Sequence, residues 1–307
     1  MVPEDILFVF GSARGGTTFI GVFLQDWLQY SMGPEGSFVV TFHKKLPKYG
    51  ELSDDNNFNR LLRDLSACDM LEIMRSKWPK PDRIDIDAGM LRQHSPENNY
   101  ASAVYAVFDS IRHASGKQRL GIKYPGFWRY LDTLEEIFKE RARYLWVLRD
   151  GRDVALSNYH VSWGLRNAYA CAQLWKSMTE TVERFKQFID PRRFVSLRYE
   201  DILSSPKTTI EVLMEQLDIK TDKNILRKAT EKLLASPMRN NYDKWKKEMP
   251  ANELRIYEAI AGDVLRKYGY QVINKNATVT KMEIVHYASA EFLRKVKLSI
   301  KKDVFKQ

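Results

Sequence analysis

The sequence predicts an α/β protein in which a central parallel sheet is flanked by helices. Apolar runs typical of buried strands alternate along the chain with segments of helical periodicity, and such alternation favours a parallel sheet. Two of the apolar runs lead into turns rich in glycine or in charge, and a helical pattern follows each turn. The 307 residues, 44% hydrophobic and 29% charged, suffice for one globular domain with insertions.

Each expected strand is a short apolar run bounded by turn residues: 6–10, 120–123, 144–148 and 194–197. Helices are expected where apolar residues recur every three or four positions: 17–30, 59–75, 100–114, 131–139, 152–162, 169–188, 207–217, 225–234 and 253–268. The stretch 31–93 carries prolines and polar runs, so we expect an irregular insertion there, on the side where such a scaffold usually recognises its substrate. Residues 1–273 then form one domain, and residues 274–307 form a basic C-terminal helical tail.

The first motif is the turn Gly-Ser-Ala-Arg-Gly-Gly-Thr-Thr at residues 11–18, between the first strand and the first helix. A glycine-rich turn at a helix N-terminus directs backbone N–H groups to one point, which suits a phosphate or sulfate. It nearly fits the pattern G-x-x-x-x-G-K-[ST] and predicts a P-loop-type domain. Thr17 replaces the lysine of the pattern, and Arg14 is the cation of the loop. The loop is therefore poorly equipped for a magnesium–triphosphate. The alternative is an ordinary glycine-rich turn.

The second motif is Arg-Asp-Gly-Arg-Asp at residues 149–153, which follows the strand at 144–148 and opens a helix containing Ser157. An arginine at a strand end and a hydroxyl one turn into the next helix can converge on one anion. The alternative is a plain strand-to-helix junction with Asp153 as a first-turn acid, and both interpretations can hold together.

Together the two motifs resemble those of the sulfotransferases that use 3′-phosphoadenosine-5′-phosphosulfate (PAPS), in particular bacterial members. The first turn is similar to their R/K-S-G-T-T loop, with Gly15 in place of the usual serine, which puts in doubt the restraint of premature donor cleavage that is attributed to that serine. The second is similar to their R-D-x-R-D-V-A-x-S-x-Y segment. The resemblance extends over about residues 5–272 through weaker matches at 121–125, 197–206, 242–246 and 269–270.

The resemblance implies in-line transfer of a sulfuryl group from PAPS to an acceptor hydroxyl without a metal. Arg14 and Lys123 would stabilise charge on the leaving bisphosphate, together with backbone N–H groups of the loop. Arg149 and Ser157 would hold the 3′-phosphate. The residues implied to bind the donor are Arg14, Gly15, Gly16, Thr17, Thr18, Arg149, Ser157, Tyr199, Trp245 and Lys246, with Arg239 as a further candidate.

The acceptor hydroxyl must lose a proton, so a general base is needed. Aryl and steroid members use a histidine two residues after the lysine that matches Lys123. Pro125 stands at that position here, which excludes this solution. Carbohydrate and protein-tyrosine members often use a glutamate shortly after the first helix, and the run Gly-Pro-Glu-Gly around Glu35 matches that place. Glu35 is the expected base, with His43 and His94 as alternatives, unless Glu35 is only a turn residue.

A glutamate base favours a sugar hydroxyl, on a carbohydrate or glycolipid, over a phenol. Peptide tyrosine and small-molecule hydroxyls are the alternative acceptors. Two other classes stay open at this point, a P-loop kinase and a non-catalytic nucleotide-binding module. Thr17 at the lysine position counts against the kinase, while Gly15 leaves some room for the module.

The formal net charge is +10 at pH 7, and residues 294–306 carry six basic residues against one acid. No nucleic-acid-recognition motif accompanies this charge, so no nucleic-acid partner is expected. The sequence has neither an apolar run of about 18 residues nor a secretory signal, so a cytoplasmic protein is expected. Apolar residues of the tail fall near one helical face among cations: Leu293, Val296, Ile300 and Val304. The segment 291–307 is therefore expected either to contact the inner face of a membrane or to pack on the domain.

Overall fold

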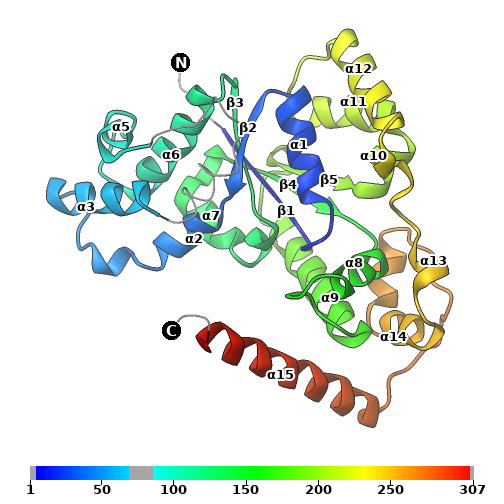
Figure 1. The fold of residues 1–307 in the computed structure, drawn as a ribbon. Coiled ribbons are helices and arrows are strands. Elements are labelled where there is room, and N and C mark those ends of the chain that lie inside the picture. The colour runs from blue at the N-terminus through cyan, green and yellow to red at the C-terminus, as the bar shows by residue number, and fades with distance from the viewer. Residues whose placement is uncertain (1–4, 69–85, 305–307) are drawn as a thin grey trace.

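The computed structural model describes residues 5–68 and 86–304 and contains one sheet of five parallel strands (Figure 1). The strand order is β2-β3-β1-β4-β5, so the first strand is central. The strands are β1 (Ile6–Gly11), β2 (Tyr30–Glu35), β3 (Arg119–Lys123), β4 (Ala142–Leu148) and β5 (Phe194–Arg198). This arrangement confirms the α/β class.

Helices cover both faces of the sheet (Figure 1). The α-helices are α1 (Thr17–Trp27), α2 (Ser37–His43), α3 (Asp55–Ser66), α5 (Ala88–Gln93), α6 (Tyr100–Ala114), α7 (Leu131–Phe138), α8 (Gly151–Tyr159), α9 (Ala168–Lys186), α10 (Tyr199–Ser204), α11 (Pro206–Gln216), α12 (Lys223–Leu234), α13 (Trp245–Glu248), α14 (Ala251–Lys267) and α15 (Lys281–Val304). Short 3₁₀ helices occupy Leu46–Lys48, Pro125–Arg129, Lys139–Arg141, Pro191–Arg193 and Pro237–Asn240.

Each face of the sheet has its own apolar core. Leu7 and Val9 of β1 pack in a core with α1, α10, α11 and α12. Phe8 and Phe10, which alternate with them, pack in a larger core with α6, α7, α9 and α14. Because a parallel strand is buried on both faces, it reads in the sequence as a continuous apolar run. This is why the four expected strands all form.

The edge strand β2 is not predicted by the sequence pattern, which extends the first helix to residue 30 and leaves the following stretch irregular. The helix ends at Trp27, and Gln29 with φ +60° turns the chain back toward the sheet. Among the described strands β2 pairs only with β3, and it contains Gly33 and Pro34. An edge strand tolerates proline because one side of it needs no ladder hydrogen bonds.

The described parts of the stretch after β2 are largely helical rather than irregular. Helix α3 begins earlier than expected because Asp54 caps it, accepting hydrogen bonds from the N–H groups of Asn56 and Asn57 at 2.9 and 3.0 Å. Capping of this kind is local and stabilises a helix by about 1 kcal/mol. Residues 69–75 of the expected helix lie outside the described residues.

Helix α15 extends along one side of the molecule near α9 and α14 (Figure 1). Polar groups attach it: Glu283 pairs with Arg255, and Glu291, only 6% exposed, accepts from the backbone N–H of Arg166 at 3.4 Å. None of the described helices is long and apolar enough to cross a membrane. Residues 305–307 of the expected tail lie outside the described part.

Candidate active site

The turn between β1 and α1 requires glycine at two positions. Gly16 has φ +92°, and a Cβ atom there would lie 2.3 Å from the ring of Tyr199. A Cβ atom on Gly11 would lie 2.3 Å from the carbonyl oxygen of Val147 in β4. Only glycine combines the left-handed conformation with so close an approach. The two glycines therefore let the loop lie against the ends of β4 and β5.

Arg14 at the tip of this loop meets Ser157 of α8. The Nε of Arg14 donates to the Ser157 hydroxyl at 3.1 Å. Helix α1 starts at Thr17, and its N-cap Gly16 offers no side-chain acceptor. The first N–H groups of a helix have no intrahelical partner, so they and the positive end of the helix dipole favour an anion at this point.

Arg149, at the end of β4, is buried and held from three directions. Its Nη1 donates to the carbonyl oxygen of Arg14 at 3.1 Å, and its Nη2 donates to that of Asn241 at 2.9 Å. The guanidinium carbon lies 4.7 Å from the ring centroid of Tyr199, whose hydroxyl accepts from Asn241 at 3.0 Å. The Nε of Arg149 has no hydrogen-bond partner among the described residues. A fixed guanidinium with a spare buried donor suits an anionic oxygen.

Asp153 lies one turn before Ser157 on the same face of α8, and both line the same cleft. One carboxylate oxygen accepts from the backbone N–H of Trp245 at 2.9 Å, and the other has no partner within the described chain. Burial raises the pKa of Asp153 because the charged carboxylate is poorly solvated there.

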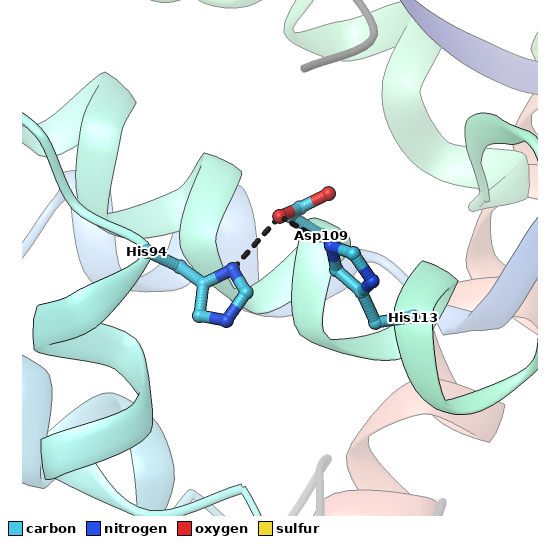
Figure 2. A group of neighbouring side chains, drawn as sticks. All are labelled: His94, Asp109 and His113. Atoms are coloured by element: carbon cyan, nitrogen blue, oxygen red, sulfur yellow. Dashed lines mark hydrogen bonds and ion pairs between the residues drawn. The ribbon is translucent and has the colours of Figure 1, made fainter. Parts of the chain in front are cut away.

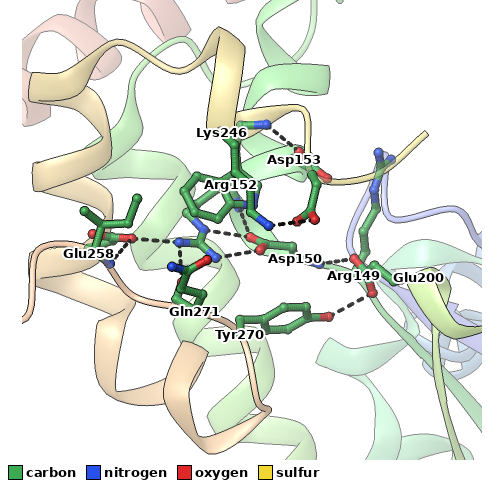
Figure 3. A network of polar contacts seen from close by, with 12 residues as sticks. Arg149, Asp150, Arg152, Asp153, Glu200, Lys246, Glu258, Tyr270 and Gln271 are labelled. Atoms are coloured by element: carbon green, nitrogen blue, oxygen red, sulfur yellow. Dashed lines mark hydrogen bonds and ion pairs between the residues drawn. The ribbon is translucent and has the colours of Figure 1, made fainter. Parts of the chain in front are cut away.

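Behind the cleft, Arg152 is fully buried in a polar network (Figure 3). Its guanidinium binds Asp150 at 2.7 Å, Glu258 at 2.7 Å and the carbonyl oxygen of Gln271 at 2.7 Å. It also lies over the Trp245 ring at 3.4 Å. Buried charges are stable only when they are paired and hydrogen-bonded. The network thereby fixes the junction of β4 and α8 against α13 and α14.

A further acid, Glu200 in the first turn of α10, supports the same junction. Glu200 accepts from the backbone N–H of Asp150 at 2.8 Å and from the hydroxyl of Tyr270 at 3.1 Å (Figure 3). Burial raises the pKa of Glu200, although these hydrogen bonds oppose the shift. The backbone that carries Arg149 is therefore anchored on both sides.

Glu35 and Lys123 meet where β2 and β3 end. The two residues are opposite each other in the strand register, and the Nζ of Lys123 lies 3.0 Å from Oε1 of Glu35. The Lys123 side chain is 11% exposed, whereas that of Glu35 is 49% exposed. The buried lysine thus holds a carboxylate that solvent or a ligand can still reach.

These groups share one cleft with a volume of about 810 Å³. Among the residues implied by the sequence, those that line it are Arg14, Gly16, Thr17, Thr18, Glu35, Arg149, Ser157 and Tyr199. Ligand pockets are usually about 300–1,000 Å³, so the cleft can hold a nucleotide and part of an acceptor. Residues of both sequence motifs and Glu35 therefore line one cleft.

Comparison with known protein families identifies the family of this chain. A sequence model of the sulfotransferase family matches residues 6–223. The chain belongs to the sulfotransferase family. It is therefore an enzyme of the sulfuryl-transfer class. A search of curated proteins found no match.

Solved structures of sulfotransferase domains have a similar fold. One is the sulfotransferase domain of the olefin synthase of Synechococcus PCC 7002, 18% identical with a TM-score of 0.57, over 88% of this chain and 96% of that one. Another is the sulfotransferase domain from the curacin biosynthetic pathway, 17% identical with a TM-score of 0.52, over 88% of this chain and 99% of that one. At this identity the likeness concerns the fold.

Other residues implied by the sequence are not among the described lining of this cleft. The N–H of Gly15 is taken by the carbonyl oxygen of Ser12 at 2.8 Å. Lys123 contacts the cleft through Glu35. Trp245 is 1% exposed and stacks on Arg152, and Lys246 pairs with a neighbouring aspartate at 2.7 Å. Lys244, two residues earlier, lines the cleft instead.

Several residues that line the cleft were not identified as site residues from the sequence: Tyr124, Arg129, His160, Trp163, Asn241 and Lys244. His160 could have been found, because it lies one turn after Ser157 at the end of α8. The guanidinium of Arg129 lies 4.1 Å from the Trp128 ring centroid, and Trp163 is 59% exposed. Their place at the cleft depends on the packing of distant segments, which no local pattern reports.

The alternative bases lie elsewhere in the fold. The ring of His43 packs near Tyr100, with centroids 5.6 Å apart, and His94 binds Asp109 at 2.8 Å. Neither is among the described lining of the cleft, and Arg239 is not either, although its neighbour Met238 is. Of the three candidate bases, Glu35 is thus the one found among the described lining of the cleft.

Proposed function

We propose that the protein transfers a sulfuryl group from PAPS to an acceptor hydroxyl, with Glu35 as the general base and without a metal. The observation that carries the proposal is that Arg14, Ser157 and Arg149, from two distant motifs, face one cleft with Glu35. The spare Nε of Arg149 and the free first turn of α1 fit a nucleotide with phosphate groups at two positions. Cationic side chains supply the charge that a metal would otherwise bring.

The residues then divide the work of one displacement. The donor supplies the sulfuryl group, the acceptor oxygen forms the new S–O bond, and the bond from sulfur to the phosphate oxygen breaks. Glu35 takes the proton of the acceptor hydroxyl, and Arg14 with the loop N–H groups binds the negative charge that develops on the phosphate. Once Glu35 is neutral, Lys123 at 3.0 Å loses its anionic partner and can turn its charge toward the leaving phosphate.

We propose a carbohydrate or glycolipid as the acceptor, with peptide tyrosine or a small-molecule hydroxyl as the alternative. The half-exposed carboxylate of Glu35 suits a hydroxyl that approaches from solvent. The exposed indole of Trp163 offers a flat apolar face beside the polar side chains of His160 and Arg129. A ring with one apolar face and a rim of hydroxyls fits such a surface. A panel of sugar, glycolipid, peptide and phenolic acceptors with labelled donor distinguishes these classes.

The affinities of the protein for different nucleotides test whether PAPS is the donor. We expect adenosine 3′,5′-bisphosphate to bind without magnesium roughly ten- to a hundredfold more tightly than AMP, because each charge-assisted contact contributes about 1.5–3 kcal/mol. Calorimetry with the bisphosphate, AMP and ATP measures this difference. Equal affinity for AMP and the bisphosphate contradicts the proposal, and magnesium-dependent preference for ATP favours a kinase. Bisphosphate binding with no consumption of PAPS by any acceptor favours a non-catalytic module.

We further propose that this enzyme is cytoplasmic and that α15 rests on anionic lipid at the inner membrane face. The helix meets the domain through Glu283, Glu291 and the partly buried ring of Tyr287. Other apolar side chains of the helix are exposed: Met282 at 83%, Val285 at 65%, Phe292 at 67%, Leu293 at 58% and Val296 at 39%. The side chains of Ile300 and Val304 lie outside the described ones. The six basic residues within 294–306 favour an anionic bilayer as the surface that covers this face.

Vesicle co-sedimentation tests the lipid contact. Binding should require anionic lipid, fall with added salt, and be lost on truncation after Ala290 or in a Phe292→Ser, Leu293→Ser variant. Phe188→Ser is the matched control, because Phe188 is 86% exposed near the end of α9 and should not matter. Absence of binding at low salt contradicts the contact. A concentration-dependent dimer lost in the double variant also contradicts it, because a second copy would then cover the apolar face.

A further inference from the structure

Three ligand-type side chains gather between α5 and α6, away from the cleft (Figure 2). His94 directly follows α5, and Asp109 and His113 are one turn apart on α6. One potential ligand atom from each lies within 4.8 Å of those of the other two. The Asp109 side chain is 6% exposed, that of His94 25% and that of His113 55%, so the group opens to solvent on the His113 side.

The distances separate two kinds of contact. Nδ1 of His94 lies 2.8 Å from Oδ2 of Asp109, which is a hydrogen bond. Nε2 of His113 lies 3.5 Å from the same oxygen, which is too long for a good hydrogen bond. Ligand atoms about 2.0–2.2 Å from a tetrahedral zinc ion are about 3.3–3.5 Å apart. Nε2 of His113 and Oδ2 of Asp109 already have this separation. Nδ1 of His94 would have to withdraw from Oδ2 by about 0.6 Å, and the ligand nitrogens of the two rings, which lie within 4.8 Å of each other, would have to adjust to enclose one ion.

Arg112 orients the carboxylate of this group. Its Nε and Nη2 donate to Oδ1 of Asp109 at 2.8 and 2.6 Å. The other oxygen, Oδ2, is thus turned toward both imidazole rings. Partners that hold the outer atom of a ligand in this way are typical of metal sites. Nη2 of Arg112 also lies 2.9 Å from Nε2 of His113, and an ion at this position would replace that contact.

We propose that His94, Asp109 and His113 bind one divalent transition-metal ion of the zinc type, with water as the remaining ligand. Two imidazole nitrogens and one carboxylate oxygen are a ligand set that zinc accepts, and an open position is common with three protein ligands. The ion would join the C-terminal end of α5 to the last two turns of α6. Its role is structural, because none of the three residues is among the described lining of the cleft.

Zinc and cobalt titrations of the chelator-treated protein test the site. Wild type should bind one equivalent of Co²⁺ with the visible absorption of a four- or five-coordinate ion, and Zn²⁺ should displace it. At a hundredfold excess of Zn²⁺ over its Kd, the melting temperature should rise by several degrees. His94→Ala and His113→Ala should each weaken binding at least about tenfold and abolish the temperature rise.

The choice of variants separates a loss of metal binding from a failure to fold. His113→Ala removes a half-exposed ring, so it should fold even if His94→Ala does not, and circular dichroism without metal checks both. His286→Ala is the matched control, because this exposed histidine on α15 lies outside the group. Wild-type binding that is no tighter than that of a His94→Ala, His113→Ala variant overturns the proposal. So does a cobalt spectrum of the six-coordinate aquo type.

Discussion

Arg14 and Ser157 are 143 positions apart in the sequence, and the Nε of one donates to the hydroxyl of the other at 3.1 Å. The same arginine offers its carbonyl oxygen to Arg149. The tip of the loop after β1 is therefore bonded both to Arg149, directly after β4, and to Ser157 inside α8. Such preformed positions lower the entropy cost of binding an anionic ligand.

Removing the guanidinium of Arg149 should weaken the binding of the donor PAPS. Arg149→Ala is expected to raise the apparent KM for PAPS roughly ten- to a hundredfold with a smaller effect on kcat, since it removes charge-assisted contacts of about 1.5–3 kcal/mol. Arg149→Lys should restore only part of the affinity, because an ammonium group cannot reach Arg14 and Asn241 at once. An unchanged donor KM in the alanine variant would refute the assignment.

Glu35→Gln should separate catalysis from binding. The amide keeps the shape of the carboxylate but cannot take a proton, so kcat should fall about 10²–10⁴-fold while bisphosphate affinity stays close to wild type. Glu51→Gln, an exposed glutamate outside the cleft, is the control. Near-normal turnover in Glu35→Gln together with loss of activity in His43→Ala or His94→Ala would transfer the role to a histidine.

Because of the buried carboxyl group of Asp153, we expect the protein to take up a proton when it binds the nucleotide. Burial already raises the pKa of Asp153, and a 3′-phosphate between Arg149 and Ser157 would raise it further through like-charge repulsion. Because the protonated form is favoured in the complex, affinity for the bisphosphate should increase as pH falls toward this pKa. Asp153→Asn should remove that component of the pH dependence, and AMP, which lacks the 3′-phosphate, should show little of it in either protein. Identical pH slopes for the two proteins with the bisphosphate would exclude this role.

Gly16 can be compared with a second glycine of similar backbone conformation. Gly16 and Gly116 both have positive φ, +92° and +61°, but only at Gly16 would a Cβ atom collide with Tyr199; at Gly116 it meets open space. Gly116→Ala should cost about 1 kcal/mol through backbone strain alone. Gly16→Ala should lower the free energy of unfolding by more than this and weaken nucleotide binding as well. Denaturant melts measure the free energy of unfolding of both variants. Equal losses would show that the Tyr199 ring moves aside at little cost.

The parts of the fold that were predictable are those with a strong local pattern. Buried parallel strands appear as apolar runs, and the loop with Arg14 and the segment with Arg149 carry their own signatures. Strand β2 has no such run, because it lies at the sheet edge and contains Gly33 and Pro34. The walls of the cleft beyond the motifs depend on which segments pack side by side, so Trp163 and Lys244 could not be predicted.

The tail shows a different limit. Its periodicity correctly indicates a helix, but an amphipathic pattern does not tell which face meets the domain. Glu283 and Glu291 attach α15 to Arg255 and to the backbone of Arg166, while Phe292 is 67% exposed. The face of α15 that meets the domain thus combines the Glu283–Arg255 ion pair and the Glu291 hydrogen bond with the packing of Tyr287 against the main core.

The buried guanidinium of Arg152 sets the length of the shortest fragment that can fold. The family match ends at residue 223, yet Glu258 and the carbonyl oxygen of Gln271 neutralise and satisfy this side chain. A chain cut after the matched region would leave a buried cation with half of its partners, a loss of about 3–5 kcal/mol for one broken buried pair, which is a large share of the stability of an ordinary domain. Removal of the segment that carries Glu258 and Gln271 should therefore destabilise the cleft from a distance, and a fusion partner is best joined beyond Gln271.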